Sequence, residues 1–108
     1  MLCYKKNQMD FRFDEEKARI GKLNYLGKEF SFTDVPIFEI SQRDEKGRQY
    51  KTAATDFELK ECNSNDNQFS CIYENTELSV KISAEINTAI SWGISVRNRG
   101  SKVIEWVN

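Results

Sequence analysis

The 108-residue sequence contains no histidine, and this absence limits the chemistry that the chain can perform. Histidine is the commonest general acid–base in enzymes and the commonest metal ligand. The three cysteines, Cys3, Cys62 and Cys71, are not spaced like zinc ligands, and they have no histidine to activate one of them as a nucleophile. We therefore expect no catalytic residue, no metal site and no cofactor.

An excess of charge of either sign is also missing. Sixteen basic and seventeen acidic residues give a net charge of -1. Because nucleic-acid binding usually requires a basic patch, we expect no nucleic-acid partner. No apolar run approaches the roughly 18 residues of a membrane span, and the mean hydropathy is -0.67, so we expect no membrane insertion.

Signal-peptide features are absent from the N-terminal residues, where Lys5 and Lys6 follow Tyr4 without an apolar stretch. This favours a cytoplasmic protein with three reduced thiols, although a Cys62–Cys71 bridge is conceivable if the two cysteines flank one hairpin. Proline occurs once, at Pro36, and there is no linker or low-complexity tract. The length suits one domain over residues 1–108.

The acidic residues do not suggest a site. Paired carboxylates such as Asp14–Glu16 and Asp44–Glu45 fall in expected turns, where they serve solubility, whereas a glycosidase needs two carboxylates across a cleft. The Asn65–Asn67 segment lacks the glycine and the distal glutamate of a helix–loop–helix calcium site.

Alternation of apolar and polar residues, which is typical of strands, is the strongest positive signal. It predicts strands over the segments Met9–Phe13, Phe30–Phe32, Ile37–Ser41, Phe69–Tyr73, Leu78–Ile86 and Ile90–Val96. Residues Gln49–Leu59 form a weaker extended region. The spacing in Ala18–Leu26 fits a helix, but Gly21 and Gly27 favour a strand with a turn. Turn residues recur about every eight to twelve positions, which predicts an all-β antiparallel sandwich.

The C-terminal residues predict a hairpin. Asn98–Ser101 supplies turn residues after Ile90–Val96, and Val103–Val107 would return as the second strand. A hairpin in this position suggests the N-terminal portion of a larger β-architecture. Val103–Val107 would be an edge strand with one charge, Glu105, so we expect Val103, Glu105, Trp106 and Val107 to form an interface, most simply in a two-fold homodimer.

Aromatic residues could stack on sugar rings. Trp92 lies in the apolar row of its strand and is expected in the core. Trp106 would share a face with Ile104 and is a candidate for the core, for an interface or for carbohydrate binding. Tyr50 is a second candidate for carbohydrate binding.

The order of several short motifs resembles the N-terminal part of a galactose mutarotase-like β-supersandwich domain, as found in glycoside hydrolases. The motifs are the alternating phenylalanines of Phe11–Phe13, GKEF at Gly27–Phe30, PIFEISQRDEKG at Pro36–Gly47, DFE at Asp56–Glu58, and the strand and turn of Trp92–Gly100. The resemblance implies association with carbohydrate-active enzymes, and no catalytic residue can be carried over because the mutarotases use a histidine.

These observations predict a non-catalytic β-sandwich domain with a structural or assembly role and possible carbohydrate binding. The partner would be a second copy or other domains of a larger enzyme. Two alternatives remain open: an autonomous carbohydrate-binding module, and a small self-associating protein of unrelated function.

Overall fold

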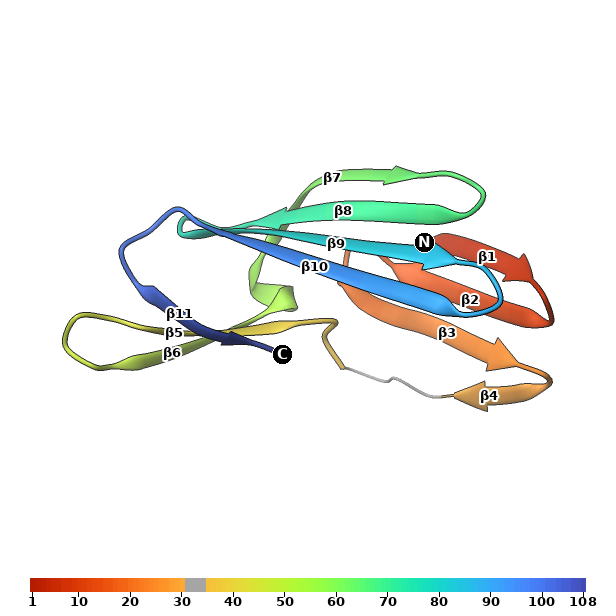
Figure 1. Ribbon diagram of the computed structural model, residues 1–108, viewed down its shortest axis with the longest axis horizontal. Coiled ribbons are helices and arrows are strands. Elements are labelled where there is room, and N and C mark those ends of the chain that lie inside the picture. The colour runs from red at the N-terminus through yellow and green to blue at the C-terminus, as the bar shows by residue number, and fades with distance from the viewer. Residues whose placement is uncertain (31–34) are drawn as a thin grey trace.

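The computed structural model describes residues 1–30 and 35–108, whose strands form three antiparallel sheets (Figure 1). The N-terminal sheet has the order β1 (Leu2–Lys6), β2 (Met9–Asp14), β3 (Arg19–Tyr25), β4 (Lys28–Phe30). The long sheet has the order β10 (Ile90–Asn98), β9 (Leu78–Ile86), β8 (Gln68–Glu74), β7 (Glu58–Ser64). The small sheet has the order β11 (Val103–Val107), β5 (Glu39–Arg43), β6 (Gln49–Ala53). A 3-10 turn, η1 (Ala54–Asp56), connects β6 to β7.

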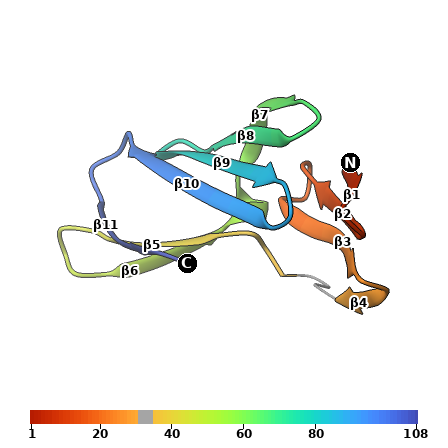
Figure 2. The ribbon, with the colours of Figure 1, turned by 45° about the vertical axis from the view of Figure 1, so that its right-hand side comes forward.

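The long sheet forms one layer of a sandwich, and the other two sheets lie end to end beneath it (Figures 1 and 2). Ring contacts join the layers at both ends. Phe13 of β2 stacks on Phe69 of β8 with centroids 4.8 Å apart. Phe38, just before β5, packs against Tyr73 of β8 at 6.0 Å. The predicted all-β antiparallel sandwich is therefore confirmed.

The core follows from the alternation in the central strands. In β9 every second residue from Leu78 to Ile86 is at most 3% exposed, while the residues between them face solvent or are half-buried. The same pattern buries Met9, Phe11 and Phe13 in β2. The strands β2 and β9 thus have one face in the core and one wet face, as their alternation of apolar and polar residues predicts.

The ambiguous segment from residue 18 to residue 26 is a strand, β3, rather than a helix. Leu26 and Gly27 both have positive φ, 52° and 79°, so the chain reverses tightly into β4. Phe30 lies in β4, whereas Phe32 of the predicted Phe30–Phe32 strand lies outside the described residues. The polar residues Asn63 and Ser64 still belong to β7, so the turn into β8 is short.

The predicted C-terminal hairpin is wrong. After β10 the chain crosses to the other layer, and β11 pairs with β5 of the small sheet instead of with β10. Two side chains between β10 and β11 hold this connection to the β8–β9 turn. Arg99 donates to the carbonyl of Asn75, and Lys102 Nζ donates to Glu77 at 2.5 Å. The hydrogen bond to Glu77 raises the pKa of Lys102 above its ordinary value.

The β5–β6 turn is built around the carboxylate of Asp44. Its Oδ1 accepts hydrogen bonds from the backbone N–H groups of Lys46 and Arg48, at 3.0 and 2.9 Å. Its Oδ2 accepts from Arg48 Nε at 3.1 Å and from the Tyr50 hydroxyl at 3.0 Å. These bonds, first among them that from the Arg48 backbone, hold the pKa of Asp44 below its ordinary 3.8.

We expect Asp44→Asn to lower the melting temperature of the chain by about 2–5 °C at neutral pH, because the charged acceptor of the turn is lost. The pKa of Asp44 is lower in the folded than in the unfolded chain, so its contribution is present above pH 3.8 and is lost as the pH falls through the folded value. Thermal denaturation at pH 7 and at about pH 2.5 measures both effects. A gap between wild type and variant that is equally large at both pH values would contradict the assigned role.

Candidate functional site

The long sheet ends on one side at β10, whose outer edge pairs with no described strand. The N–H of Arg99, just after β10, donates to the carbonyl of Glu77 on the β9 side at 2.7 Å. Because hydrogen bonding alternates along an antiparallel strand, the odd-numbered residues of β10 bond β9. The even-numbered residues, from Ile90 to Asn98, therefore direct their N–H and C=O groups away from the sheet.

The middle of the apolar row of β10, Trp92 and Ile94, is exposed, although it lies on the same face as the buried row of β9. Trp92 is opposite Ala84 and Ile94 is opposite Ile82 in the register. Ala84 and Ile82 are 3% exposed, whereas Trp92 is 42% and Ile94 is 46% exposed. The second layer covers β9 and leaves much of β10 open to solvent.

Trp92 was expected in the core, and the structure corrects this expectation. One side of the indole contacts the rings of Phe11, Phe13 and Phe69, with centroids 5.9 to 6.1 Å apart. The rest of the side chain faces solvent, because β10 is the outermost strand of its sheet.

The inner face of the N-terminal sheet is also exposed at its last strand. Phe30 of β4 pairs with Leu23, which in turn pairs with buried Phe11, so the three residues share a face. Phe30 is nevertheless 40% exposed. The opposite side of the sandwich is closed, because Tyr4 donates to the carbonyl of Gln68 at 3.0 Å and Lys6 bonds Asn67 at 2.8 Å.

We call β10, with Trp92 and Ile94, the open edge.

The predicted interface on β11 is split between two faces. A bulge between Ile104 and Trp106 shifts the register, so Ile104 and Val107 both pack against the core. Trp106 therefore does not share a face with Ile104. Val103 and Trp106 are 65% and 50% exposed on the other face, opposite Arg43 and Ser41.

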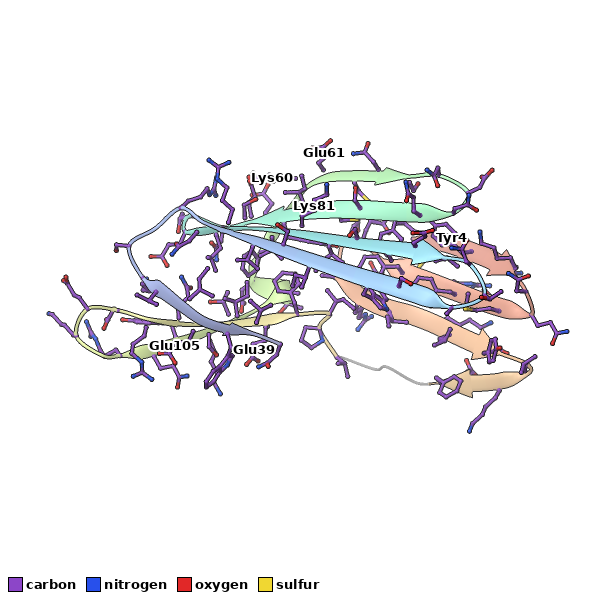
Figure 3. All side chains as sticks on the ribbon, in the orientation of Figure 1. Tyr4, Glu39, Lys60, Glu61, Lys81 and Glu105 are labelled. Carbon is purple, nitrogen blue, oxygen red and sulfur yellow. The ribbon has the colours of Figure 1, made fainter. Side chains whose placement is uncertain are left out.

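The carboxylate of Glu105 is paired with a cation of the same chain. It forms an ion pair with Arg43 of β5, and Figure 3 shows the Glu105 side chain on the small sheet. The bulge and this ion pair are features that protect an edge strand against pairing with another chain. The interface on Val103, Glu105, Trp106 and Val107 remains a prediction.

The two candidate sugar-binding aromatics do not form one platform. Tyr50 is opposite Gln42 in the register and Trp106 is opposite Ser41, so the two rings lie on opposite faces of the small sheet. The Tyr50 hydroxyl is bonded to Asp44, and Lys102 Nζ lies 4.8 Å from the centre of its ring. Each residue separately remains a predicted carbohydrate contact.

A shallow groove of about 510 Å³ crosses the wet face of the long sheet. Its floor is a cross-strand row of small residues, Ser70, Ser83 and Gly93, which are neighbours in the register. A Cβ at Gly93 would lie 2.8 Å from Ser83 Oγ, so a larger residue here would require the serine hydroxyl to move. Lys81 and Glu85 of β9 flank the row, and Figure 3 shows Lys81 on this sheet.

Cys62 and Cys71 are directly opposite each other on β7 and β8, and both are free thiols, as is exposed Cys3. Burial, and next a hydrogen bond with Cys62, raise the pKa of Cys71 well above its usual range. A thiol in this state is a poor nucleophile and a poor metal ligand. Within residues 1–30 and 35–108, no three acidic or sulfur side chains gather in a way that could hold a metal ion.

The exposed residues Trp92 and Ile94 of β10 were missed as functional candidates. The sequence does carry a signal for them, because Arg97 is the only charge in nine consecutive residues. Among the described residues, no helix has the length and apolarity needed to cross a membrane. Comparison with known proteins finds no family model that matches the chain and no curated protein that is significantly similar to it.

Proposed function

We propose that the chain is a non-catalytic β-sandwich that works as an assembly module and joins a further β-structure through the open edge. The observation that carries this proposal is the contrast along one apolar face. The β9 row is buried, and the adjoining β10 residues Trp92 and Ile94 are 42% and 46% exposed. An apolar row that runs onto an unpaired edge is a feature of interaction surfaces.

The non-catalytic part of the proposal rests on the sequence. The chain has no histidine, and the pKa of Cys71, the thiol buried beside Cys62, is raised rather than lowered. The resemblance to galactose mutarotase-like domains would place such a module beside carbohydrate-active enzymes, and this placement is part of the proposal.

We expect the purified chain, of 12.6 kDa, to associate reversibly toward twice that mass. Sedimentation equilibrium from low micromolar to near-millimolar concentrations measures this. A contact along one nine-residue strand would be small among specific interfaces, so we expect a dissociation constant of about micromolar or weaker. A single monomeric species over the whole range would reject self-association, and a dimer that forms through another edge would reject the role proposed for the open edge.

The groove on the long sheet favours a second function, that of a carbohydrate-binding module. Its hydroxyl, amide and charged side chains, among them Ser70, Ser83 and Lys81, could hydrogen-bond a polyhydroxylated ligand. Titration of the monomeric chain with oligosaccharides, followed by backbone amide chemical shifts, distinguishes the two functions. Saturable shifts at Ser70, Ser83 and Gly93, together with a monomeric chain, would favour the module.

A further inference from the structure

We infer that the partner at the open edge is a second copy of the chain, and that the two copies pair antiparallel along β10 about a two-fold axis at Ile94. This inference rests on the proposed function, because it assigns the partner and the register of that assembly. The two four-stranded long sheets would become one continuous sheet of eight strands.

The backbone of β10 is suited to this pairing. The N–H and C=O groups of the even-numbered residues point away from β9, as the Arg99–Glu77 bond shows. With the axis at Ile94, Ile94 meets Ile94 of the second copy, Trp92 meets Val96, and Ile90 meets Asn98. All of these are even-numbered residues, so both copies present donors and acceptors to each other, which allows about ten hydrogen bonds.

The side chains are complementary in the same register. On the apolar face, Trp92 lies beside Val96 of the second copy, which is a favourable aromatic and β-branched pair. On the wet face, Gly93 meets Ser95 and Ser91 meets Arg97. The two Arg97 side chains lie at opposite ends of the new pair, so no like charges face each other.

The other edges of the described sheets are less suited to a second copy. β4 has three residues, and β11 carries the bulge and the Arg43–Glu105 ion pair. β7 has a bulge and the charged residues Lys60 and Glu61, which Figure 3 shows at the top of the molecule. β1 carries Lys5 and Lys6, and β6 is five residues long with Lys51 at its centre. β10 is nine residues long, has no register shift and bears one charge.

Amide hydrogen exchange of the full chain, followed by NMR at several concentrations, tests the inference. The amides of Trp92, Ile94 and Val96 should exchange rapidly in dilute solution and become at least tenfold slower as the dimer forms. The amides of Gly93 and Ser95 should be protected at every concentration, because they bond β9. This alternating response is specific to pairing along β10.

A matched pair of variants tests whether β10 or β11 is the strand that pairs with the second copy. Ile94→Lys places two like charges at the two-fold axis and should weaken the dimer at least about 100-fold, while the monomer remains folded because Ile94 is 46% exposed. Val103→Lys makes the same change on β11 and should leave dimerisation unchanged.

Two results would overturn the inference, and they differ in what they say of the proposed function. A dimer in which the Trp92, Ile94 and Val96 amides stay unprotected, and which Val103→Lys disrupts, would reject pairing along β10 and with it the proposed function, which places assembly at the open edge. A chain that is monomeric at all concentrations would reject the second copy as the partner and leave the open edge to a different β-structure.

Discussion

Replacing Phe69 with alanine should lower the free energy of unfolding by about 3–5 kcal/mol, which is the typical cost of removing a buried aromatic ring. Phe69 is 2% exposed, and its ring contacts those of Tyr4, Phe11, Phe13 and Trp92. These rings come from both layers, so one truncation opens a cavity between them. For a domain whose total stability is about 5–15 kcal/mol, the loss should bring the chain close to unfolding at 37 °C.

Urea denaturation followed by tryptophan fluorescence measures the loss, because Trp92 is in contact with the deleted ring. The matched control is Phe30→Ala, which removes the same ring from a site that is 40% exposed and should cost less than about 1 kcal/mol. Equal losses in the two variants would show that Phe69 does not hold the layers together.

The thiol of Cys71 should react with an alkylating reagent at least about 1,000-fold more slowly than that of Cys3 in the native chain. Cys71 is fully buried and its pKa is raised by burial, so its thiolate forms only when the β7–β8 region opens. Cys3 is exposed on the edge strand β1 and is open to attack at all times. Half-buried Cys62 should react at an intermediate rate.

Mass spectrometry of peptides after timed alkylation gives the rate for each cysteine. In denaturant without a reducing agent, all three thiols should react at similar rates, which also tests the expectation that they are free. Recovery of a single reactive thiol would reveal a Cys62–Cys71 bridge, and a native Cys71 rate within tenfold of that of Cys3 would contradict its burial.

The strands were the part of this fold that the sequence could predict. The alternation from Leu78 to Ile86 places each apolar residue on one face, so both the element and its buried side follow from the pattern. Alternation identifies a face but not what covers it, and for this reason the exposure of Trp92 could not be predicted. The strand β1 was missed because its charged residues Lys5 and Lys6 resemble a solvated terminus.

The pairing partner of β11 could not be predicted from local residues. The turn residues Asn98–Ser101 suit both a tight hairpin and a crossing between layers. Because consecutive strands are usually neighbours, the hairpin was the expected outcome. The deciding contacts are distant in sequence, such as the Arg43–Glu105 ion pair and the bonds of Lys102 and Arg99 to the β8–β9 turn. The bulge after Ile104 then reverses which side chains face the core, and a strict period of two cannot show such a shift.

The pairing of β11 with β5 also has a consequence for the rate of folding. The Arg43–Glu105 contact joins residues 62 positions apart, so β11 can join the local β5–β6 hairpin only after a long loop of chain has closed. Contacts of such high sequence separation slow folding, and sheet-rich domains of this kind reach the native state in milliseconds to seconds. Refolding should therefore proceed with the local β8–β9–β10 meander formed early and β11 docked last. Substitutions in β11 should accelerate unfolding while leaving the folding rate nearly unchanged.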